Sequence, residues 1–531
     1  MQTSVKKMGM TAFAGMLVAA VASEGLAAPA VRTDADRNAT TLNVGFRRLG
    51  TLMPRTVKEV GPSNWTIDAT PLDRDFADFD KYREYLIPLG VAKIRLMTGW
   101  AKSEKVRGVI DVGWLDHVVD WCLANGIEPL LELSYGNPIY PGAGGAGLKD
   151  GIPSTPEGLA AWDRWVEFLG GHFKGRVREW AMWNEPDINR SALNTPETVS
   201  AFNVRSAKIL RRHMPKCVLH GLSLAGRSWV MPCVKAMGED AKLFDTFVYH
   251  GYVGNPDTSY ADVEKLKAEL KAVLPDARLR QGENGCASEW LDRFALRWHP
   301  WSEASQAKWD MRRMLGDLGH DVESGLFCIV DFNYQPPTFP VFFCNRKGYL
   351  RANASNDVIR VKRSYYAVQN TVGVFDATVK RVREGQLAAC TDRTVSLYEY
   401  RTANGSPLLA FWHHGPVKVE PAKAAGSTFQ ANQGLKVVLD PEARPGDSFE
   451  TRGVAFTWGG RPFVDPVWVD LMTGWVYELP ADLQIVHSCG IDFAEIPVYD
   501  SPCLLTERAA IRFTAVGGGT ADTSRMRRAS R

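Results

Sequence analysis

The chain has 531 residues, more than one hydrophobic core comfortably holds, so its length favours two domains, one of which can be a barrel of roughly 250 to 300 residues. Hydrophobic residues make up 45% of the chain and charged residues 23%, the mixture of an ordinary soluble globular protein. The formal net charge of +3 is small for this size, and no Lys/Arg-rich stripe interrupts the central region, which argues against nucleic acid as the main partner.

The N-terminus has the residue order of a secretory signal. Lys6 and Lys7 precede an apolar run over residues 8–22, and small residues follow at 27–30. The run is shorter than the roughly 20 residues that cross a bilayer, which favours a cleaved signal over a membrane anchor. We therefore expect residues 1–30 to be a signal peptide, with export to the periplasm or the exterior and no membrane span after its removal.

A barrel is predicted for residues 31–374. Short apolar runs alternate there with long amphipathic stretches, which is typical of βα units around a parallel sheet. Eight strands with intervening helices favour a closed (β/α)8 barrel, an α/β fold whose active site lies at the C-terminal ends of the strands. The expected strands are 92–97, 128–133, 177–183, 218–222, 247–250, 279–283 and 326–331, with one more near 44–49, and the main helical patterns are 114–125, 156–173, 196–214, 261–273 and 303–318.

After about residue 375 the helical period disappears. Short β-rich runs at 395–400, 408–412, 463–471 and 511–513 are separated by Gly, Pro and Asn, which predicts a β-sandwich accessory domain over 375–515. Residues 516–531 are Gly-rich and then basic, as in a disordered tail. The nine cysteines lack the spacing of a metal site, and their odd number leaves at least one thiol free. A disulfide between Cys328 and Cys344 is possible, but the sequence does not assign it.

Two carboxylates stand where strand patterns end. Glu185 follows the run 177–183, and Pro186 is expected to restrict Glu185 to extended geometry. Glu283 ends the run 279–283 and is followed by Asn284 and Gly285. A retaining glycoside hydrolase needs two carboxyls about 5 to 5.5 Å apart, and a barrel can supply them from two strand ends. Glu185 is thus the candidate acid/base, and Glu283 the candidate nucleophile.

These residues resemble the retaining hydrolases of glycoside hydrolase clan A, and within the clan family 39, known for β-xylosidases and α-L-iduronidases. The resemblance covers roughly residues 85–370 and implies an acid/base after the fourth strand and a nucleophile ending the seventh. The chain departs from the common family pattern in two places. Gly282 and Asn284 flank Glu283 where the family commonly has Thr and Trp, and Met97 stands where it has a His two residues after Arg95. The substrate is therefore left open. The supporting motifs are Trp183-Asn184-Glu185-Pro186 with the preceding Lys174-Gly175-Arg176-Val177, and Ser364-Tyr365-Tyr366-Ala367.

The resemblance implies further substrate-binding residues. Asn184 should bind the sugar's 2-hydroxyl, and Arg95 should pair with the nucleophile, since a charge inside a strand is expensive to bury alone. His250 and Tyr252 should contact the nucleophile and the sugar, and a tyrosine beside Glu283 would help keep it ionised. Aromatic side chains near strand ends can stack on sugar rings, although core packing is the alternative for each. These candidates are Trp100, Tyr135, Trp290 and Tyr334.

The sequence does not support a dinucleotide-binding, esterase or zinc motif. The glycine-rich run 142–147 fits a dinucleotide fingerprint, but no helix follows it directly, so we interpret it as a loop beside the cleft. The run 221–225, Gly-Leu-Ser-Leu-Ala, lacks the last glycine of an esterase elbow, which disfavours a serine esterase. No His-Glu-x-x-His or paired-cysteine zinc pattern occurs, so neither a metal nor another cofactor is expected.

The sequence therefore favours a secreted retaining O-glycosidase that acts on plant or microbial oligo- or polysaccharides by double displacement. The more specific prediction is an exo-acting β-glycosidase of the β-xylosidase type. A carbohydrate-binding barrel without turnover is the alternative, and tight sugar binding without hydrolysis would distinguish it. The oligomeric state is left open.

Overall fold

The computed structural model describes residues 38–188, 194–335, 343–417 and 449–516. The predicted signal peptide and all but the first residue of the predicted tail lie outside these residues. Within them, no helix is both long and apolar enough to cross a membrane.

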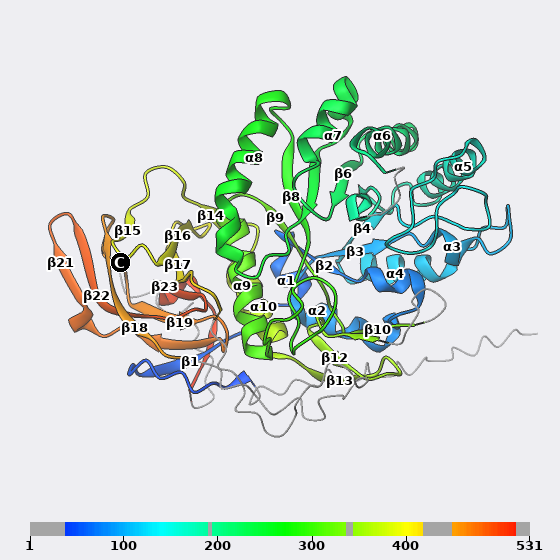
Figure 1. The fold of residues 1–531 in the computed structure, drawn as a ribbon. Helices are drawn as coiled ribbons and strands as arrows, with labels where there is room; N and C mark the ends of the chain where they lie inside the picture. Colours follow the sequence, from blue (N-terminus) through cyan, green and yellow to red (C-terminus); the bar gives the residue numbers. More distant parts are fainter. Residues whose placement is uncertain (1–37, 189–193, 336–342, 418–448, 517–531) are drawn as a thin grey trace, which may run out of the picture. The chain divides into compact units, whose positions relative to one another are not determined.

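Eight parallel strands close into a barrel, which confirms the predicted fold class. Helices surround these strands in Figure 1. In chain order the strands are β2 (Trp65–Asp68), β3 (Lys93–Met97), β4 (Glu128–Glu132), β5 (Glu179–Ala181), β6 (Val218–Leu224), β7 (Thr246–His250), β8 (Arg278–Asn284) and β9 (Glu323–Leu326). The α-helices are α1 (Val57–Val60), α2 (Leu86–Leu89), α3 (Trp100–Ser103), α4 (Gly113–Ala124), α5 (Pro156–His172), α6 (Pro196–His213), α7 (Val230–Met237), α8 (Tyr260–Val273), α9 (Glu303–Gly319) and α10 (Arg363–Val374).

Local sequence sets where the longer helices begin. The side chains of Thr155 and Thr195 accept hydrogen bonds from backbone N–H groups in the first turns of α5 and α6, and a proline follows each threonine. Such a cap satisfies an otherwise unpaired donor, and proline at the first helical position loses no helical hydrogen bond.

The first barrel strand differs from the prediction. The segment near 44–49 overlaps β1 (Arg48–Leu52). This strand pairs antiparallel with two strands of the C-terminal sheet, β20 (Trp475–Glu478) and β24 (Phe513–Ala515). The barrel begins instead at β2, whose four residues are all buried. A strand buried on both faces shows no alternation, so four residues carry little periodic signal. The last barrel strand, β9, also ends at Leu326, where the predicted strand 326–331 begins.

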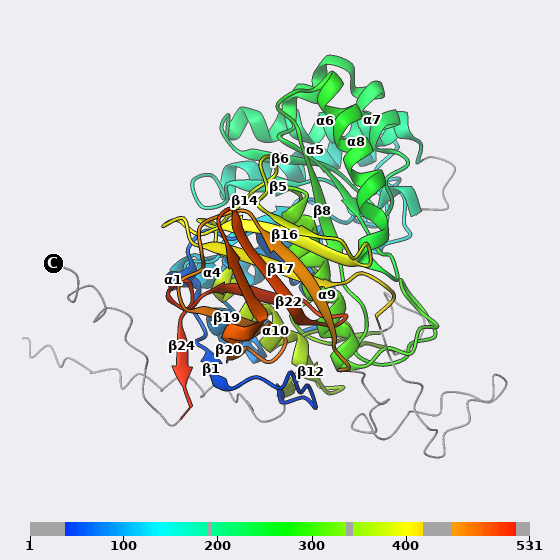
Figure 2. The same cartoon turned by 90° about the vertical axis from the view of Figure 1, so that its left-hand side faces the viewer.

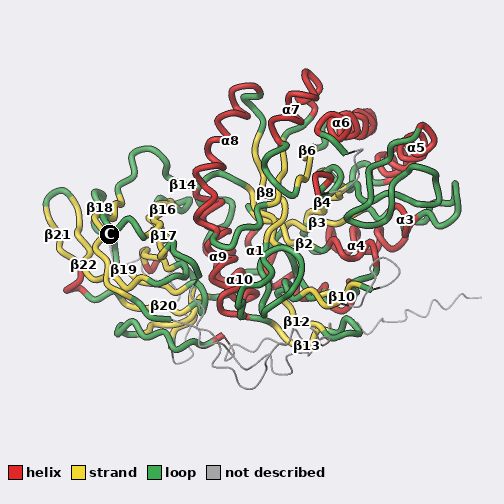
Figure 3. Tube along the Cα trace, in the orientation of Figure 1, coloured by secondary structure: helices red, strands yellow, loops and turns green. Residues whose placement is uncertain are grey.

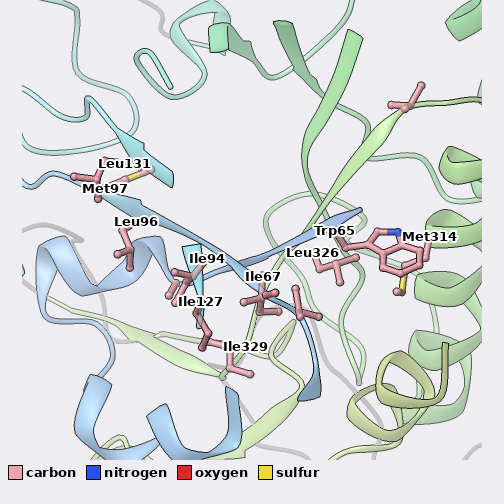
Figure 4. Close-up of a cluster of buried hydrophobic side chains, with 14 of the residues drawn as sticks. Trp65, Ile67, Ile94, Leu96, Met97, Ile127, Leu131, Met314, Leu326 and Ile329 are labelled. Carbon is pink, nitrogen blue, oxygen red and sulfur yellow. The ribbon is translucent and has the colours of Figure 1, made fainter. Parts of the chain in front are cut away.

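A buried apolar cluster packs the barrel strands against the helices around them. Figure 4 shows Trp65 and Ile67 of β2, Ile94 of β3 and Leu326 of β9 in one buried cluster, together with Met314 of α9. Polar side chains of the strands pair with one another instead: Arg280 of β8 donates hydrogen bonds to Glu323 of β9 and Thr66 of β2. The apolar cluster thus joins strands to helices, and the candidate functional groups are the polar side chains at the C-terminal strand ends.

After α10 the described chain contains β-strands and 3-10 turns but no α-helix (Figure 3). An eight-stranded sheet has the order β14-β16-β17-β23-β19-β20-β1-β24, and a four-stranded sheet has the order β15-β18-β22-β21. Figure 2 shows β16, β17 and β22 of these sheets from the front. Their bounds are β14 (Lys380–Arg381), β15 (Ala388–Cys390), β16 (Val395–Arg401), β17 (Pro407–His413), β18 (Arg452–Trp458), β19 (Pro466–Asp470), β20 (Trp475–Glu478), β21 (Gln484–His487), β22 (Gly490–Val498), β23 (Cys503–Glu507) and β24 (Phe513–Ala515).

The larger sheet is buried on both faces. On β17, Leu408 and Trp412 belong to the same hydrophobic cluster as the barrel, whereas Leu409 and Phe411 belong to the cluster shared with the smaller sheet. Alternate side chains of a strand point to opposite faces, so β17 joins two cores. The sandwich that the sequence predicts is therefore present. The larger sheet packs one face on the smaller sheet and the other face on the barrel domain.

Two short hairpins follow β9, and they bring loop residues to the barrel's C-terminal end. They are β10 (Phe332–Tyr334) with β11 (Phe343–Asn345), and β12 (Leu350–Ala352) with β13 (Val358–Val361). All nine cysteines lie in the described residues and are free thiols, so Cys328 and Cys344 form no disulfide. The glycine-rich run 142–147 is a loop, and α5 begins only at Pro156.

Candidate active site

The barrel register places acidic and basic groups side by side at the C-terminal ends of the strands. Asp68 of β2 is directly beside Arg95 of β3, and His250 of β7 is beside Glu283 of β8. Glu185 is the fourth residue after the end of β5. Because all these strands run parallel, their C-terminal ends meet at one edge, where an active site of this fold lies.

Arg95 is the charged centre of this site. It is 3% exposed, and its guanidinium donates hydrogen bonds to Asp68, Glu132, Asn184 and Glu283. The planar guanidinium presents several donors in a fixed geometry, which suits it to holding multiple acceptors in place. Arg95 thus pairs with Glu283, as the sequence predicts, and also with the carboxyls of Asp68 and Glu132, which the sequence analysis did not identify.

Asp68 and Glu132 are residues of the candidate site that the sequence reasoning missed. Both are buried at the ends of barrel strands. Burial raises the pKa of each carboxyl, the Glu283 charge raises it further, and Arg95 opposes the shift. The available signal was an acid inside an apolar run, as in Leu130-Leu131-Glu132-Leu133, because a buried carboxylate needs a partner.

Glu283 is held as an anion. Its Oε2 accepts a hydrogen bond of 2.6 Å from Arg95, and its Oε1 accepts one of 2.8 Å from the hydroxyl of Tyr252. Burial raises the pKa of Glu283, but His250, Arg95 and these hydrogen bonds more than offset burial, so the pKa lies well below its usual range. A carboxylate with a depressed pKa at the site is suited to nucleophilic attack.

Glu185 has an unusual backbone conformation, which corrects one expectation. Its φ is +47°, in the left-handed region, and not extended as its position before Pro186 predicts. Its N–H donates a 2.7 Å hydrogen bond to the carbonyl of Ser223. Leu222 and Ser223 also have positive φ, where β6 departs from its register with β7. This bulge, the segment that narrowly misses an esterase elbow, supplies the acceptor that holds Glu185.

His250 joins the two carboxyls. Its Nδ1 lies 2.8 Å from Glu185 Oε1 and 3.8 Å from Glu283 Oε2, and the ring is buried. Burial lowers the pKa of His250, but the Glu283 charge and the hydrogen bond with Glu185 outweigh burial and raise it. An imidazole between the two carboxyls can therefore hold or return a proton at Glu185 Oε1.

The spacing of the two carboxyls is short. One oxygen of Glu185, one oxygen of Glu283 and a nitrogen of His250 all lie within 4.8 Å of one another. Among the described residues these three are the group close enough to share a metal ion. The Arg95 guanidinium, 2.6 Å from Glu283 Oε2, would however repel a cation there.

Asn184 lies between the charged centre and an aromatic side chain. Its Oδ1 accepts a hydrogen bond from Arg95, and its Nδ2 donates one of 2.7 Å to the Tyr135 hydroxyl. A side-chain amide has two N–H donors, so one is left for a sugar hydroxyl. Tyr135 is buried, and the Arg74 guanidinium lies 5.0 Å from its ring centroid.

The structure separates the other aromatic candidates. Trp100 is fully buried in an aromatic cluster and donates its indole N–H to Glu104, so it does not reach the site. Tyr334 of β10 contacts Phe76 and the Phe294 ring. Trp290 is 39% exposed on the loop after β8, where its ring meets that of Trp298 at 5.5 Å.

Lys347 is a further residue of the site that the sequence reasoning did not identify. It follows β11, is 2% exposed, and its ammonium lies 4.1 Å from the centroid of the Tyr252 ring. No local pattern marks it, because the contact depends on how the segment after β9 folds back over β7 and β8.

Comparisons with known proteins confirm the fold. No protein-family model and no curated protein matches the chain. Among solved structures, the chain is similar to a family 39 glycoside hydrolase from the gut symbiont Bacteroides cellulosilyticus WH2, with 17% identity, a TM-score of 0.58, and coverage of 86% of this chain and 83% of that one. It is also similar to the catalytic domain of a family 30 xylanase C from Talaromyces cellulolyticus, with 9% identity, a TM-score of 0.51, and coverage of 87% and 98%. The chain therefore shares the barrel-and-sandwich architecture of these clan A enzymes.

Proposed function

We propose that the protein is a retaining O-glycoside hydrolase of clan A. The observation that carries this proposal is the proximity of Glu185 and Glu283 at the C-terminal end of the barrel. One carboxylate oxygen of Glu185 lies within 4.8 Å of one carboxylate oxygen of Glu283. Retaining enzymes hold their two carboxyls about 5 to 5.5 Å apart, whereas inverting enzymes need about 6.5 to 9.5 Å to admit a water. The observed spacing favours a direct attack by one carboxylate.

The two environments assign the roles. Glu283 is kept ionised by Arg95 and Tyr252, so it is the nucleophile that forms the glycosyl-enzyme. Glu185 Oε1 lies 2.8 Å from His250 Nδ1, and the other carboxyl is the nucleophile, so Glu185 is the acid that protonates the leaving oxygen and then the base that activates water. Asn184, with its remaining N–H, binds the 2-hydroxyl of the sugar.

The finer form of the proposal is an exported, exo-acting β-glycosidase of the β-xylosidase type that acts on plant or microbial oligosaccharides. The resemblance of the motif around Glu185 to family 39 supports it, and the residue order at 1–30 supports export. The solved structures that are similar to this chain include enzymes described as a family 39 glycoside hydrolase and a family 30 xylanase.

Trapping tests the mechanism. An activated 2-deoxy-2-fluoro glycoside should inactivate the protein and add one glycosyl mass to the peptide that contains Glu283, because the fluorine slows release of the intermediate more than its formation. The Glu283→Gln variant should take up no label. Label on another residue, or hydrolysis with inverted stereochemistry, would refute the assignment. A panel of aryl β-xylosides, β-glucosides, β-galactosides and α-L-arabinosides identifies the sugar, and tight binding without turnover across it would favour the binding-protein alternative.

A further inference from the structure

Lys347 is a buried cation that the mechanism above does not use. Its ammonium lies 4.1 Å from the ring centroid of Tyr252 and 6.0 Å from that of Phe327. In the described part of the chain its ammonium has no hydrogen-bond acceptor and no ion-pair partner. An aromatic face only partly replaces the water that a buried ammonium loses. Charges farther away therefore contribute to its stabilisation, that of Glu283 most strongly.

The titratable groups around Lys347 come from strand β8, helix α9 and the loops that follow β5, β8 and β9. Burial lowers the pKa of Lys347 to about 8, and the strongest opposing effect is the charge of Glu283, with a smaller one from Glu185. The thiols of Cys286 and Cys328 are also near, but burial raises the pKa of each, so both are neutral. Asp310 of α9 is the remaining acid that interacts with Lys347, and burial raises its pKa as well.

Tyr252 connects Lys347 to the site. The face of its ring is toward the ammonium, and its hydroxyl donates to Glu283 Oε1. A change in the charge of Glu283 is therefore felt at Lys347 both through space and through a polarised phenol. Arg95, in contrast, also binds the carboxyls of Asp68 and Glu132, whose negative charges oppose its effect on Glu283.

We propose that Lys347 is a positioning residue whose ammonium stabilises the charged state of Glu283 and so speeds the second half of the double displacement relative to the first. This inference rests on the proposed function, since it needs Glu283 as the nucleophile.

The charge on Glu283 changes in opposite directions in the two steps. In the first, a Glu283 oxygen bonds to the anomeric carbon, the bond from that carbon to the leaving oxygen breaks, and Glu185 gives that oxygen its proton. In the second, a water oxygen bonds to the anomeric carbon, a water proton passes to Glu185, and the electron pair of the breaking bond returns to Glu283. A nearby cation opposes loss of the carboxylate charge in the first step and favours its return in the second.

The positive charge that develops on the sugar ring is common to both steps. Its repulsion by Lys347 therefore cancels in the ratio of the two rates, and the ratio isolates the effect on Glu283. Aryl glycosides of one sugar measure this ratio, because kcat for an excellent leaving group reports the second step and kcat/KM for a poor leaving group reports the first.

The decisive comparison is wild type against Lys347→Met, with Lys347→Arg as the charge-retaining control. With a dinitrophenyl glycoside, Lys347→Met should lower kcat about tenfold and lower KM with it, because the intermediate accumulates. With an unactivated phenyl glycoside, kcat/KM should be unchanged or higher. Lys347→Arg should restore most of the lost kcat. Equal losses on both substrates, or a Lys347→Arg variant as impaired as Lys347→Met, would overturn the inference.

A measurement on the wild-type chain keeps the test independent of how the variants fold. The trapped fluoroglycosyl-enzyme is reactivated by azide, which needs no general base, so its rate does not require Glu185. In the trapped species Glu283 is an uncharged ester that no longer raises the pKa of Lys347, so this pKa lies below its value of about 8 in the free enzyme. The rate should therefore fall as the pH rises toward 8 and Lys347 loses its proton. A rate that stays constant across this range would overturn the inference. Failure to trap any intermediate on Glu283 would refute the proposed function itself. If the intermediate is trapped but the ratio of the two step rates is the same in Lys347→Met as in wild type, only the role of Lys347 is refuted.

Discussion

Tyr252→Phe should move the acidic limb of the pH–rate profile to higher pH. The substitution deletes one hydroxyl, which donates a 2.8 Å hydrogen bond to Glu283 Oε1, and keeps the ring that packs beneath Lys347. Glu283 attacks only when ionised, so kcat/KM falls as the pH drops through the pKa of its carboxyl.

The size of the shift follows from that hydrogen bond. A hydrogen bond to a charged group contributes about 1.5 to 3 kcal/mol, and one pKa unit corresponds to about 1.4 kcal/mol. The Glu283 pKa is depressed in the folded protein, and removing one of the causes raises it. The acidic limb of kcat/KM should therefore move up by about one to two pH units, while the alkaline limb stays in place.

The assay is the pH dependence of kcat/KM on an aryl glycoside, with Tyr249→Phe as a matched control. Tyr249 precedes His250 on β7, is buried, and its hydroxyl has no hydrogen-bond partner in the described chain. Tyr249→Phe should leave both limbs unchanged. An acidic limb that does not move in Tyr252→Phe, or one that moves equally in both variants, would refute the reasoning that Tyr252 keeps Glu283 ionised.

Three further outcomes are expected. Glu185→Ala should lower kcat/KM on a glycoside with a poor leaving group by about 10² to 10⁴-fold, and azide should restore turnover of an activated glycoside; no rescue would exclude the acid/base role. Arg95→Met should lower the free energy of unfolding, measured with urea, by about 3 to 5 kcal/mol, because it leaves buried carboxyls without their cation, and a loss below 1 kcal/mol would show that these carboxyls are neutral. Exhaustive dialysis against EDTA should leave activity unchanged, since Arg95 occupies the carboxylate that a metal would need, and activity restored only by a divalent ion would contradict this.

Much of the site followed from local patterns. Glu185 and Glu283 each end an apolar strand run, so their common location at the barrel mouth is a consequence of parallel strands and needs no knowledge of their contacts. Arg95 inside a strand demanded a partner, and the structure supplies Glu283. Trp100 shows the limit of the same reasoning, because it follows a strand closely and still turns into the core.

Other features had no local signal. The first barrel strand is too short to show a period, so β1 was assigned to the wrong sheet. Glu185 has a left-handed backbone because an acceptor on β6, far along the chain, holds its N–H. Lys347 belongs to the site only because the segment after β9 folds over Tyr252.

The sequence by itself determined the alternation of strands and helices, the β-rich second half and the two strand-end glutamates, because hydrophobic periodicity is a property of neighbouring residues. The tertiary structure decided which charges meet: Arg95 with four acceptors, His250 with Glu185, and Lys347 with Tyr252. The physical reason is that pairing energies and pKa shifts depend on distance and burial in the closed barrel, which residues far apart in the chain acquire only when the strands become neighbours.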